Sequence, residues 1–443
     1  MSIASNTIFE VRSTGSPTNG IGYTPGSSGT DWTQQAAAQY ASTDLVLTTG
    51  SVNISSATAN WGTDVVGNLI YVAGGTGAVV GNWYQIQVRN SATSISVDRS
   101  TGLVTGTGAT GNIGGAADSL GTIASMPVVA SGMIVYVKGN TAVSSATINV
   151  PGGVVNNGLN VIFVGYQTNR TQSNTDAICT ISYNVSRVTM CQSRSLWYNF
   201  LFDGNAQATA RLCASNDVFF RCLIQKMNVA SSGGIGSFHS CGATLNSAAV
   251  FTNPAFSCEA WANTATPFAS LTYVDCISYG NTGGADGFNM GGNCVTARNC
   301  DSYGNAGAGF NLGSNSRVAV MDNCHAEGNT GAGFLVGNNS FGTLLNSCST
   351  FGNTGSSISG TATMTKFNFQ ALTVGTVYTN AAGNDFSKNN LVNQGAALRA
   401  AADPQTFPRG LTANKRDAGA AQHGDPAAGG IMVVQGFLGG YNG

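Results

Sequence analysis

Charged side chains are scarce in this sequence. Its 443 residues include 18 Lys+Arg and 19 Asp+Glu, so that 8% are charged, against about 25% in an average soluble domain. A net charge of −1 and the lack of a basic block argue against binding nucleic acid through its phosphates. The scarcity of long charged side chains also argues against helical bundles and coiled coils. We therefore expect no nucleic-acid partner.

Features that mark other classes of protein are also missing. No run of about 18 apolar residues occurs, so we expect no membrane insertion. The N-terminus lacks the basic and apolar regions of a secretory signal. No Cys-x-x-Cys pair indicates a zinc site, and the glycine-rich residues 74–77 lack the helix and lysine of a phosphate loop. We expect no metal and no cofactor.

Glycine is abundant, with 60 residues, and the cysteines form a repeat. All eleven cysteines lie between Cys179 and Cys348. The later ones recur every 24 residues, at Cys276, Cys300, Cys324 and Cys348. A Gly-Asn pair follows each of them, with asparagines Asn281, Asn305, Asn329 and Asn353, and then an apolar residue, Phe288, Phe310, Phe334 or Ile358.

This repeat predicts the fold. A period of 24 residues is too short for a helical hairpin, but it fits one coil of three short strands. Coils of this kind stack about 4.8 Å apart, so equivalent residues form columns. Gly and Asn suit the left-handed corners, and stacked Asn amides can hydrogen-bond along a column. We predict an all-β protein built on a right-handed parallel β-helix.

We expect the repeated cysteines to form a buried column of free thiols. A small, soft side chain suits a crowded inner position. Disulfides are less favoured, because in-register residues of parallel strands point the same way, whereas a disulfide needs Cβ atoms at about 3.8 Å and a crossed geometry. The less regularly spaced cysteines upstream are expected to follow the same pattern in less regular coils.

The two ends of the chain lack the repeat and are expected to cover the ends of the solenoid. Residues 1–118 are predicted to hold an N-terminal segment and a small antiparallel β module, with a short helix at 34–40. The module would sit on, or be inserted near, the start of the β-helix at 119–380. Residues 381–443 are predicted to form a C-terminal cap, with a helix at 396–402, and an apolar glycine-rich tail. That tail either pairs with another chain or packs back on the solenoid.

Few carboxylates are placed for catalysis. Glycoside hydrolysis needs two carboxylates about 5–9.5 Å apart. Asp275 and Asp301 are the best candidates, because the strand pattern places them one coil apart on the face opposite the cysteines. The alternative is that both are isolated, solvated residues near strand ends. His325 follows Cys324 and is expected to be a surface residue rather than a catalyst.

Two tyrosines are candidates for glycan binding. Tyr279 and Tyr303 each follow a repeat cysteine by three residues. If the strands extend that far, the rings point outward and could stack on sugars. If the strands end earlier, the rings pack beneath a turn.

Both borders of the predicted solenoid resemble a known family. Residues 132–139 followed by 146–152 resemble the entry of pectin-lyase-like right-handed β-helices. Residues 417–422, Asp-Ala-Gly-Ala-Ala-Gln, resemble the closing segment of many such proteins. Many proteins of this fold cleave polysaccharides, so the resemblance keeps an enzyme under consideration.

A narrower resemblance is carried by N-terminal motifs. Residues 9–12, 17–23 and 29–35, followed by strands around 67–72 and 83–86 and the closure at 417–422, resemble β-helical proteins of tailed bacteriophages. This resemblance implies a virion protein, such as a tail fibre, tail spike or head decoration. It implies a homotrimer that is made in the host cytoplasm, contacts other virion proteins and is a candidate to contact host surface polysaccharide.

We expect a non-enzymatic structural protein of a phage virion. The first alternative is a polysaccharide depolymerase or lyase on a β-helix scaffold. The second alternative is a bacterial extracellular adhesin or fibre subunit.

Overall fold

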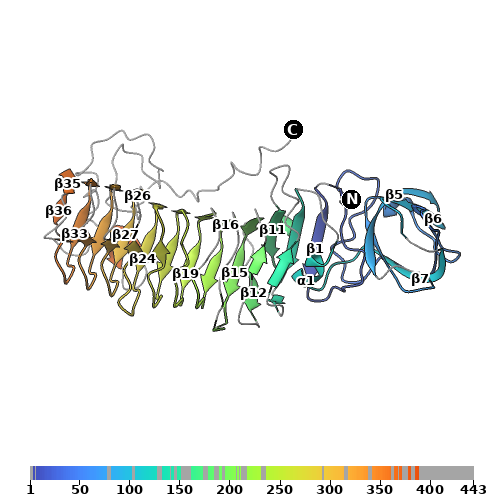
Figure 1. Cartoon of the computed structure of the whole chain (residues 1–443), viewed down its shortest axis with the longest axis horizontal. Helices are drawn as coiled ribbons and strands as arrows, with labels where there is room; N and C mark the ends of the chain where they lie inside the picture. Colours follow the sequence, from blue (N-terminus) through green and yellow to red (C-terminus); the bar gives the residue numbers. More distant parts are fainter. Residues whose placement is uncertain are drawn as a thin grey trace. The chain divides into compact units, whose positions relative to one another are not determined.

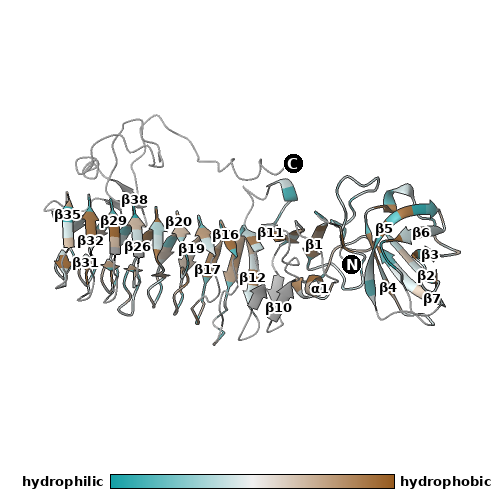
Figure 2. Ribbon diagram, turned by 45° about the horizontal axis from the view of Figure 1, so that its top comes forward, coloured by the Kyte–Doolittle hydropathy of each residue, from teal (hydrophilic) through white to brown (hydrophobic). Residues whose placement is uncertain are grey.

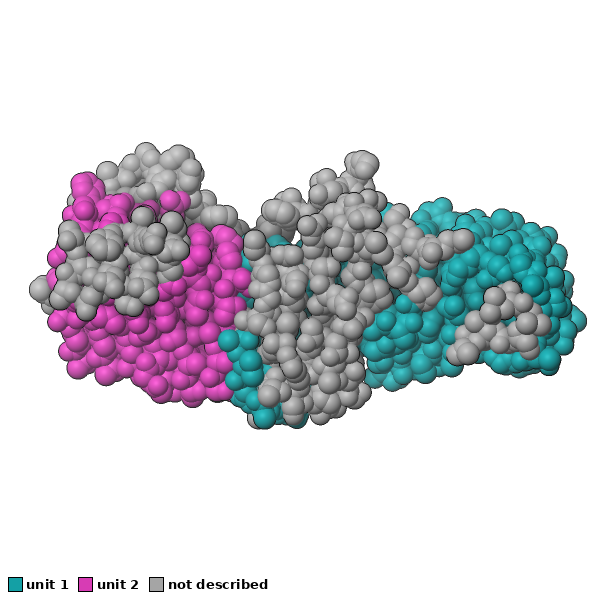
Figure 3. Space-filling view, viewed as in Figure 1, with its two compact units in different colours: residues 1–242 teal, residues 243–443 magenta. Residues whose placement is uncertain are grey.

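The computed structural model describes most of the chain up to residue 388. The described residues are 3–4, 6–76, 81–101, 105–126, 132–139, 141–143, 147–150, 161–172, 178–183, 189–191, 195–205, 207–208, 210, 217–230, 236–291, 294–313, 318–337, 342–360, 364–367, 369–371, 378–380 and 385–388. The chain divides into two units, residues 1–242 and residues 243–443 (Figure 3). Regular structure in the described part is almost all β-strand, as the sequence predicts.

Unit 1 contains a closed antiparallel barrel with strand order β2-β3-β6-β5-β4-β7 (Figure 1). These strands are β2 (Tyr40–Leu47), β3 (Asn53–Ser55), β4 (Leu69–Ala73), β5 (Asn82–Ser91), β6 (Ser94–Val97) and β7 (Gly106–Ile113). Apolar and polar residues are interleaved along the strands (Figure 2), so one face of each strand can enter the barrel core. Leu45, Ile54, Ile86 and Ile95 are buried there. The predicted antiparallel β module is confirmed.

The helix predicted at 34–40 is wrong. The backbone there bends without forming a helix, and β2 begins at Tyr40. The carbonyl of Gln35 accepts the N–H of Ala116 at 2.7 Å, and the carbonyl of Ala36 accepts the side-chain amide of Asn19 at 2.8 Å. These carbonyls are therefore used in long-range contacts instead of helical hydrogen bonds.

The barrel is inserted within the first rungs of a parallel solenoid. Strand β1 (Ile8–Arg12) lies before the barrel, and β8 (Ile134–Lys138) lies after it, yet the two pair in parallel. The N-terminal segment thus supplies the first strand of a sheet whose next strand is more than 100 residues downstream. Of the two arrangements that the sequence leaves open, a module sitting on the start of the β-helix or inserted near it, the pairing of β1 with β8 corresponds to the second.

The solenoid strands of unit 1 form parallel sheets. The first sheet has the order β1-β8-β11-β14-β16-β18, the second β9-β12-β15-β17, and β10 pairs with β13. The further strands are β9 (Thr141–Val143), β10 (Thr147–Val150), β11 (Val161–Tyr166), β12 (Cys179–Tyr183), β13 (Thr189–Cys191), β14 (Ser195–Tyr198), β15 (Phe200–Asp203), β16 (Val218–Phe220), β17 (Leu223–Gln225) and β18 (Ser237–His239). Short helical segments are η1 (Thr63–Val65), α1 (Leu120–Ala124) and η2 (Arg170–Gln172). The division between the units falls within β19 (Gly242–Thr244).

Unit 2 repeats three short strands per coil. Its first parallel sheet is β20 (Ala255–Phe256), β23 (Thr272–Val274), β26 (Cys294–Arg298), β29 (Val318–Asp322), β32 (Thr343–Asn346) and β35 (Met364–Phe367). Its second is β21 (Glu259–Trp261), β24 (Ile277–Tyr279), β27 (Asp301–Tyr303), β30 (His325–Glu327), β33 (Ser349–Phe351) and β36 (Gln370–Ala371). Its third is β22 (Phe268–Ala269), β25 (Phe288–Asn289), β28 (Phe310–Asn311), β31 (Phe334–Leu335) and β34 (Ile358–Ser359). Strands β37 (Tyr378–Asn380) and β38 (Asp385–Lys388) form a separate antiparallel pair.

The repeated residues of unit 2 stack in register. Phe288, Phe310 and Phe334 lie in one column, with ring centroids 4.8 and 5.1 Å apart and nearly parallel planes. The four repeat cysteines are fully buried, and the eight cysteines whose side chains are described are all free. The predicted columns of aromatic residues and free thiols are therefore confirmed in the described part. The predicted helix at 396–402, the closing segment and the tail lie outside the described residues.

Candidate functional site

The second sheet of unit 2 carries the sequence-predicted candidates on its outer face. In β24 and β27 the middle residues, Ser278 and Ser302, point inward, because their hydroxyls accept from the buried Asn281 and Asn305 at 3.0 and 2.9 Å. The first and third residues of each strand therefore share the opposite face. We call this the outer face of the second sheet. Its members are Glu259, Trp261, Ile277, Tyr279, Asp301, Tyr303, His325, Glu327, Ser349 and Phe351.

Aromatic rings line one column of this face. Trp261 pairs with Tyr279, and Tyr279 pairs with Tyr303, on neighbouring rungs. The Trp261 and Tyr279 rings are 6.1 Å apart and nearly parallel. Tyr279 packs against Trp261, Ile277 and Tyr303 and is 7% exposed, whereas Tyr303 is half-buried. The strands do extend to both tyrosines, but Tyr279 is packed rather than freely exposed.

Carboxylates adjoin these rings. Burial raises the pKa of Tyr279 well above its usual range, and the neighbouring Glu259 raises it further through charge and a hydrogen bond. Burial and the charge of Glu327 likewise raise the pKa of Tyr303. Flat aromatic rings can stack on the apolar face of a sugar. Carboxylate oxygens beside them can accept hydrogen bonds from the hydroxyls of the sugar.

The prediction that His325 is a surface residue is wrong. His325 does lie on the outer face, but it is fully buried. Its Nδ1 is 2.8 Å from the Ser349 hydroxyl, and its Nε2 is 3.1 Å from Glu327 Oε2. Ser349 is also fully buried and Glu327 is 3% exposed. A nucleophile, a base and an acid are thus in line, but the closed environment of the hydroxyl gives a substrate no access to it.

Asp275 and Asp301 do not share a column. Asp301 begins β27, pairs with Ile277 and His325, and is fully buried. Asp275 occupies a left-handed turn with φ of 55° and is 7% exposed. The left-handed residue before each cysteine interrupts the alternation of a strand, so counting positions across that turn fails. Neither aspartate is solvated, which also corrects the alternative considered from the sequence.

The turn residues form their own polar column. Asn299 Nδ2 donates to Asp275 Oδ1 at 2.8 Å, and Asn323 Nδ2 donates to Asn299 Oδ1 at 3.2 Å. Asp275 therefore acts as the acceptor at one end of an amide ladder. These hydrogen bonds give Asp275 a structural role.

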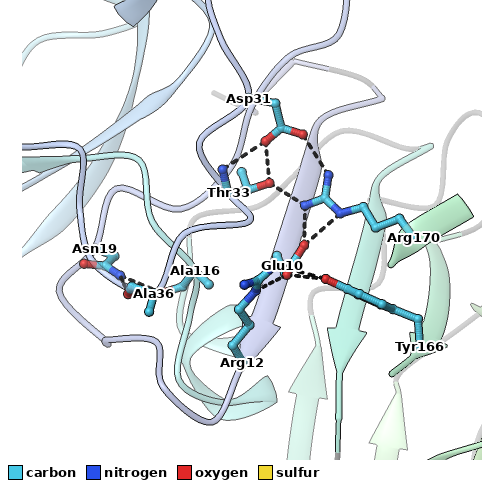
Figure 4. Close-up of polar contacts among 9 residues, drawn as sticks. All are labelled: Glu10, Arg12, Asn19, Asp31, Thr33, Ala36, Ala116, Tyr166 and Arg170. Carbon is cyan, nitrogen blue, oxygen red and sulfur yellow. Dashed lines mark hydrogen bonds and ion pairs between the residues drawn. The ribbon is translucent and has the colours of Figure 1, made fainter. Parts of the chain in front are cut away.

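A second polar cluster, in unit 1, was missed by sequence reasoning (Figure 4). Glu10 on β1 is fully buried and accepts hydrogen bonds from Arg12, from the hydroxyl of Tyr166, and from Arg170 Nε at 2.7 Å. Arg170 also pairs with Asp31 at 2.7 Å, and its guanidinium lies 4.5 Å from the centroid of the Tyr136 ring. Burial, followed by the hydrogen bond that its hydroxyl donates to Glu10, raises the pKa of Tyr166. No local motif could reveal contacts that join residues about 140–160 positions apart.

The cluster ties three parts of unit 1 together. Glu10 comes from the first solenoid strand, Asp31 from the segment before the barrel, and Tyr166 and Arg170 from the end of β11 and from η2 (Figure 4). Two acids and two arginines balance in charge, so the cluster is a satisfied ion-pair network. It holds the segment that leads into the barrel against the first rungs.

Two features are absent from the described part of the chain. Its residues include no group of three or more His, Cys, Asp or Glu side chains placed to hold a metal ion. No helix there combines the length and apolar character needed to cross a membrane.

No family model matches the chain, and no curated protein matches it in a sequence search.

Proposed function

We propose that this protein is a structural component of a tailed bacteriophage particle, such as a tail fibre, tail spike or head decoration, and that it acts as a homotrimer on a pectin-lyase-like β-helix. The observation that carries the proposal is the continuous rung-to-rung bonding of unit 2. From Asn246 to Asn353, each buried asparagine joins its coil to the next. Such bonding opposes local opening, and a particle exposed outside the cell needs this resistance.

The burial of both candidate aspartates supports the non-enzymatic part of the proposal. Asp275 ends the turn ladder, and Asp301 is closed within the outer face. Neither forms the open pair that glycoside hydrolysis uses. The protein in this proposal contributes shape and stability rather than chemistry.

The test is to locate the protein in a particle. Antibodies raised against the purified chain should label tails or heads of phage particles that carry its gene, and mass spectrometry of purified particles should recover its peptides. Light scattering of the purified chain should give three times the 45.0 kDa chain mass. Labelling of bacterial cell surfaces without labelling of particles would favour the adhesin instead.

A polysaccharide-binding or polysaccharide-cleaving role is the second candidate. It is favoured by the aromatic column of Trp261, Tyr279 and Tyr303 beside Glu259 and Glu327. Replacing Trp261 with Ala should abolish retention on the host polysaccharide, whereas Trp83→Ala in the barrel should not. Release of reducing or unsaturated ends that Asp301→Asn or Glu327→Gln removes would identify cleavage and would contradict the non-enzymatic proposal.

A further inference from the structure

A buried carboxyl group lies inside the solenoid of unit 1. Asp217 directly precedes β16 and is 3% exposed. Its Oδ1 accepts the backbone N–H of Ser195 at 2.8 Å, and its Oδ2 accepts the indole N–H of Trp197 at 3.4 Å. Its own carbonyl accepts the N–H of Ser237 at 3.2 Å. One residue therefore connects the starts of β14, β16 and β18.

The described residues in contact with this carboxyl group are uncharged. Trp197 is fully buried and stacks on Phe163 at 4.0 Å. The titratable side chains on the three strands are Tyr198 and His239, and both occupy half-buried positions that alternate with the buried ones. Arg221, after β16, is half-buried in a left-handed turn. The two groups that hydrogen-bond to the carboxyl group are thus neutral N–H donors, and among the described residues no ion pair includes Asp217.

The burial of the Asp217 carboxyl group makes the stability of the folded state depend on pH. Burial disfavours the ionised form and raises the pKa of Asp217 to about 7, although the N–H groups of Ser195 and Trp197 oppose the shift. An aspartate in an unfolded chain has a pKa of about 3.9. Between these values the folded state holds a proton that the unfolded state has lost. The stabilisation is complete in acid and is lost as the pH rises through this window.

We propose that Asp217 is a proton-controlled lock in unit 1, which closes the contact among β14, β16 and β18 when neutral and loosens it when ionised. The neutral carboxyl group packs in the apolar interior beside Trp197. Ionisation leaves a buried charge with two neutral donors. Opening of the strands then lets water solvate this charge, which lowers the free energy of the open state relative to the closed one. The lock lies outside the ladders of unit 2 and does not depend on the proposed function.

The test compares the whole chain with its Asp217→Asn variant, which keeps the shape of the side chain but cannot ionise. Hydrogen exchange read out by peptide would be measured from pH 4.5 to 8, after correction for intrinsic exchange rates. In the wild type, the opening constant of peptides covering 195–203 and 217–225 should rise up to tenfold per pH unit between about pH 5 and 6.5, because one proton is released. In Asp217→Asn this slope should vanish. Equal slopes in the two proteins would overturn the proposal.

A matched control separates this effect from the loss of any carboxylate. Asp203 lies nearby in the sequence, is partly exposed, and pairs with Lys226 at 3.3 Å. Asp203→Asn should keep the wild-type slope in the same peptides. If Asp217→Asn does not fold, the wild type alone decides: its 195–203 peptides must lose protection with pH relative to barrel peptides, and parallel behaviour of the two regions would refute the lock.

Discussion

The asparagine column shows how single residues join the coils of unit 2. The Oδ1 atom of each asparagine accepts two bonds from the previous rung, one from the backbone N–H and one from the side-chain amide. At Asn305 these bonds come from Asn281, at 3.2 and 2.7 Å. Asn305 in turn donates to Asn329, at 3.0 Å from each group. Every amide is both acceptor and donor, so none can be lost without leaving buried partners unsatisfied.

Replacement of Asn305 with Ala should destabilise unit 2 by about 2–4 kcal/mol, because several buried polar groups lose their partners at once. The matched control is Asn289→Ala. That side chain is half-buried and accepts one bond, from the N–H of Gly291. It should cost less than about 1 kcal/mol. Urea unfolding followed by circular dichroism measures both, and equal losses would contradict the role of the ladder.

At the residue scale, the positions that repeat from coil to coil could be predicted from the sequence. The environment of a side chain at such a position could not. Asn281 and Asn305 could be predicted because a Gly-Asn pair recurs at a fixed spacing. Asn246 and Asn263 belong to the same column, but spacings of 17 and 18 residues hid them. His325 was misplaced because nothing in the sequence shows that an outward-facing position is covered.

At the scale of elements, the first strand of the solenoid is an edge that the chain covers itself. Outside β1, Ile8 exchanges hydrogen bonds with Tyr23, and Arg12 donates to the carbonyl of Ala117 at 2.9 Å. An edge with satisfied hydrogen bonds cannot template pairing with another chain. The sequence predicted antiparallel strands in the N-terminal module but left open whether the module sits on the solenoid or is inserted near its start, because the pairing of β1 with β8 spans the whole barrel and residues 9–12 carry no repeat.

Replacement of Glu10 with Gln should loosen this end of unit 1. The change leaves Arg170 and Arg12 without their buried counter-charge, which should cost about 3–5 kcal/mol. The exposed pair of Lys226 and Asp203 provides the comparison: Asp203→Asn should cost at most about 1 kcal/mol. Thermal unfolding gives the two losses, and exchange of β1 peptides locates the first. A Glu10→Gln protein as stable as the control would show that the network is dispensable.

At the described end of the unit 2 core, a charged side chain opposes pairing with another chain. Ala297, Met321 and Leu345 form a fully buried inner column of the first sheet. The next member of that column is Lys366, which is exposed. A charged residue at an inward position is a known means of stopping a sheet from extending into another chain.

Replacement of Lys366 with Leu should therefore promote end-to-end association. Leucine would continue the apolar column and remove the charge that a docking chain would have to bury. Sedimentation velocity at rising concentration should show species larger than the wild-type assembly, whereas Lys366→Arg should match the wild type. Identical profiles for the Leu and Arg variants would show that the end is closed by other means.

At the scale of the whole molecule, the scarcity of charge follows from in-register stacking. Each residue of a coil lies about 4.8 Å from the equivalent residue of the next coil. A charge repeated at the same position in successive coils would therefore be repelled by its neighbour. The columns of unit 2 avoid this. Arg298 is followed by Asp322 at 3.5 Å, and Asp275 is followed by Asn299. The low charge content excluded other classes of protein, and the 24-residue repeat predicted the architecture. The positions of the few remaining charges depend on the register of the strands, which composition does not contain.

Placing like charges in one column tests this rule. Asn299→Asp would set a second carboxylate beside Asp275 and remove the 2.8 Å hydrogen bond between them. It should destabilise unit 2 by about 1–3 kcal/mol at pH 7, and by less at pH 3, where one carboxyl group can hold a proton. The double variant Asp275→Asn with Asn299→Asp should recover most of the loss, because the new amide can donate to the new carboxylate, which still accepts from Asn323. Thermal unfolding of the four proteins completes the cycle. If the double variant is as unstable as Asn299→Asp alone, repulsion within a column is not what keeps the charge of this protein low.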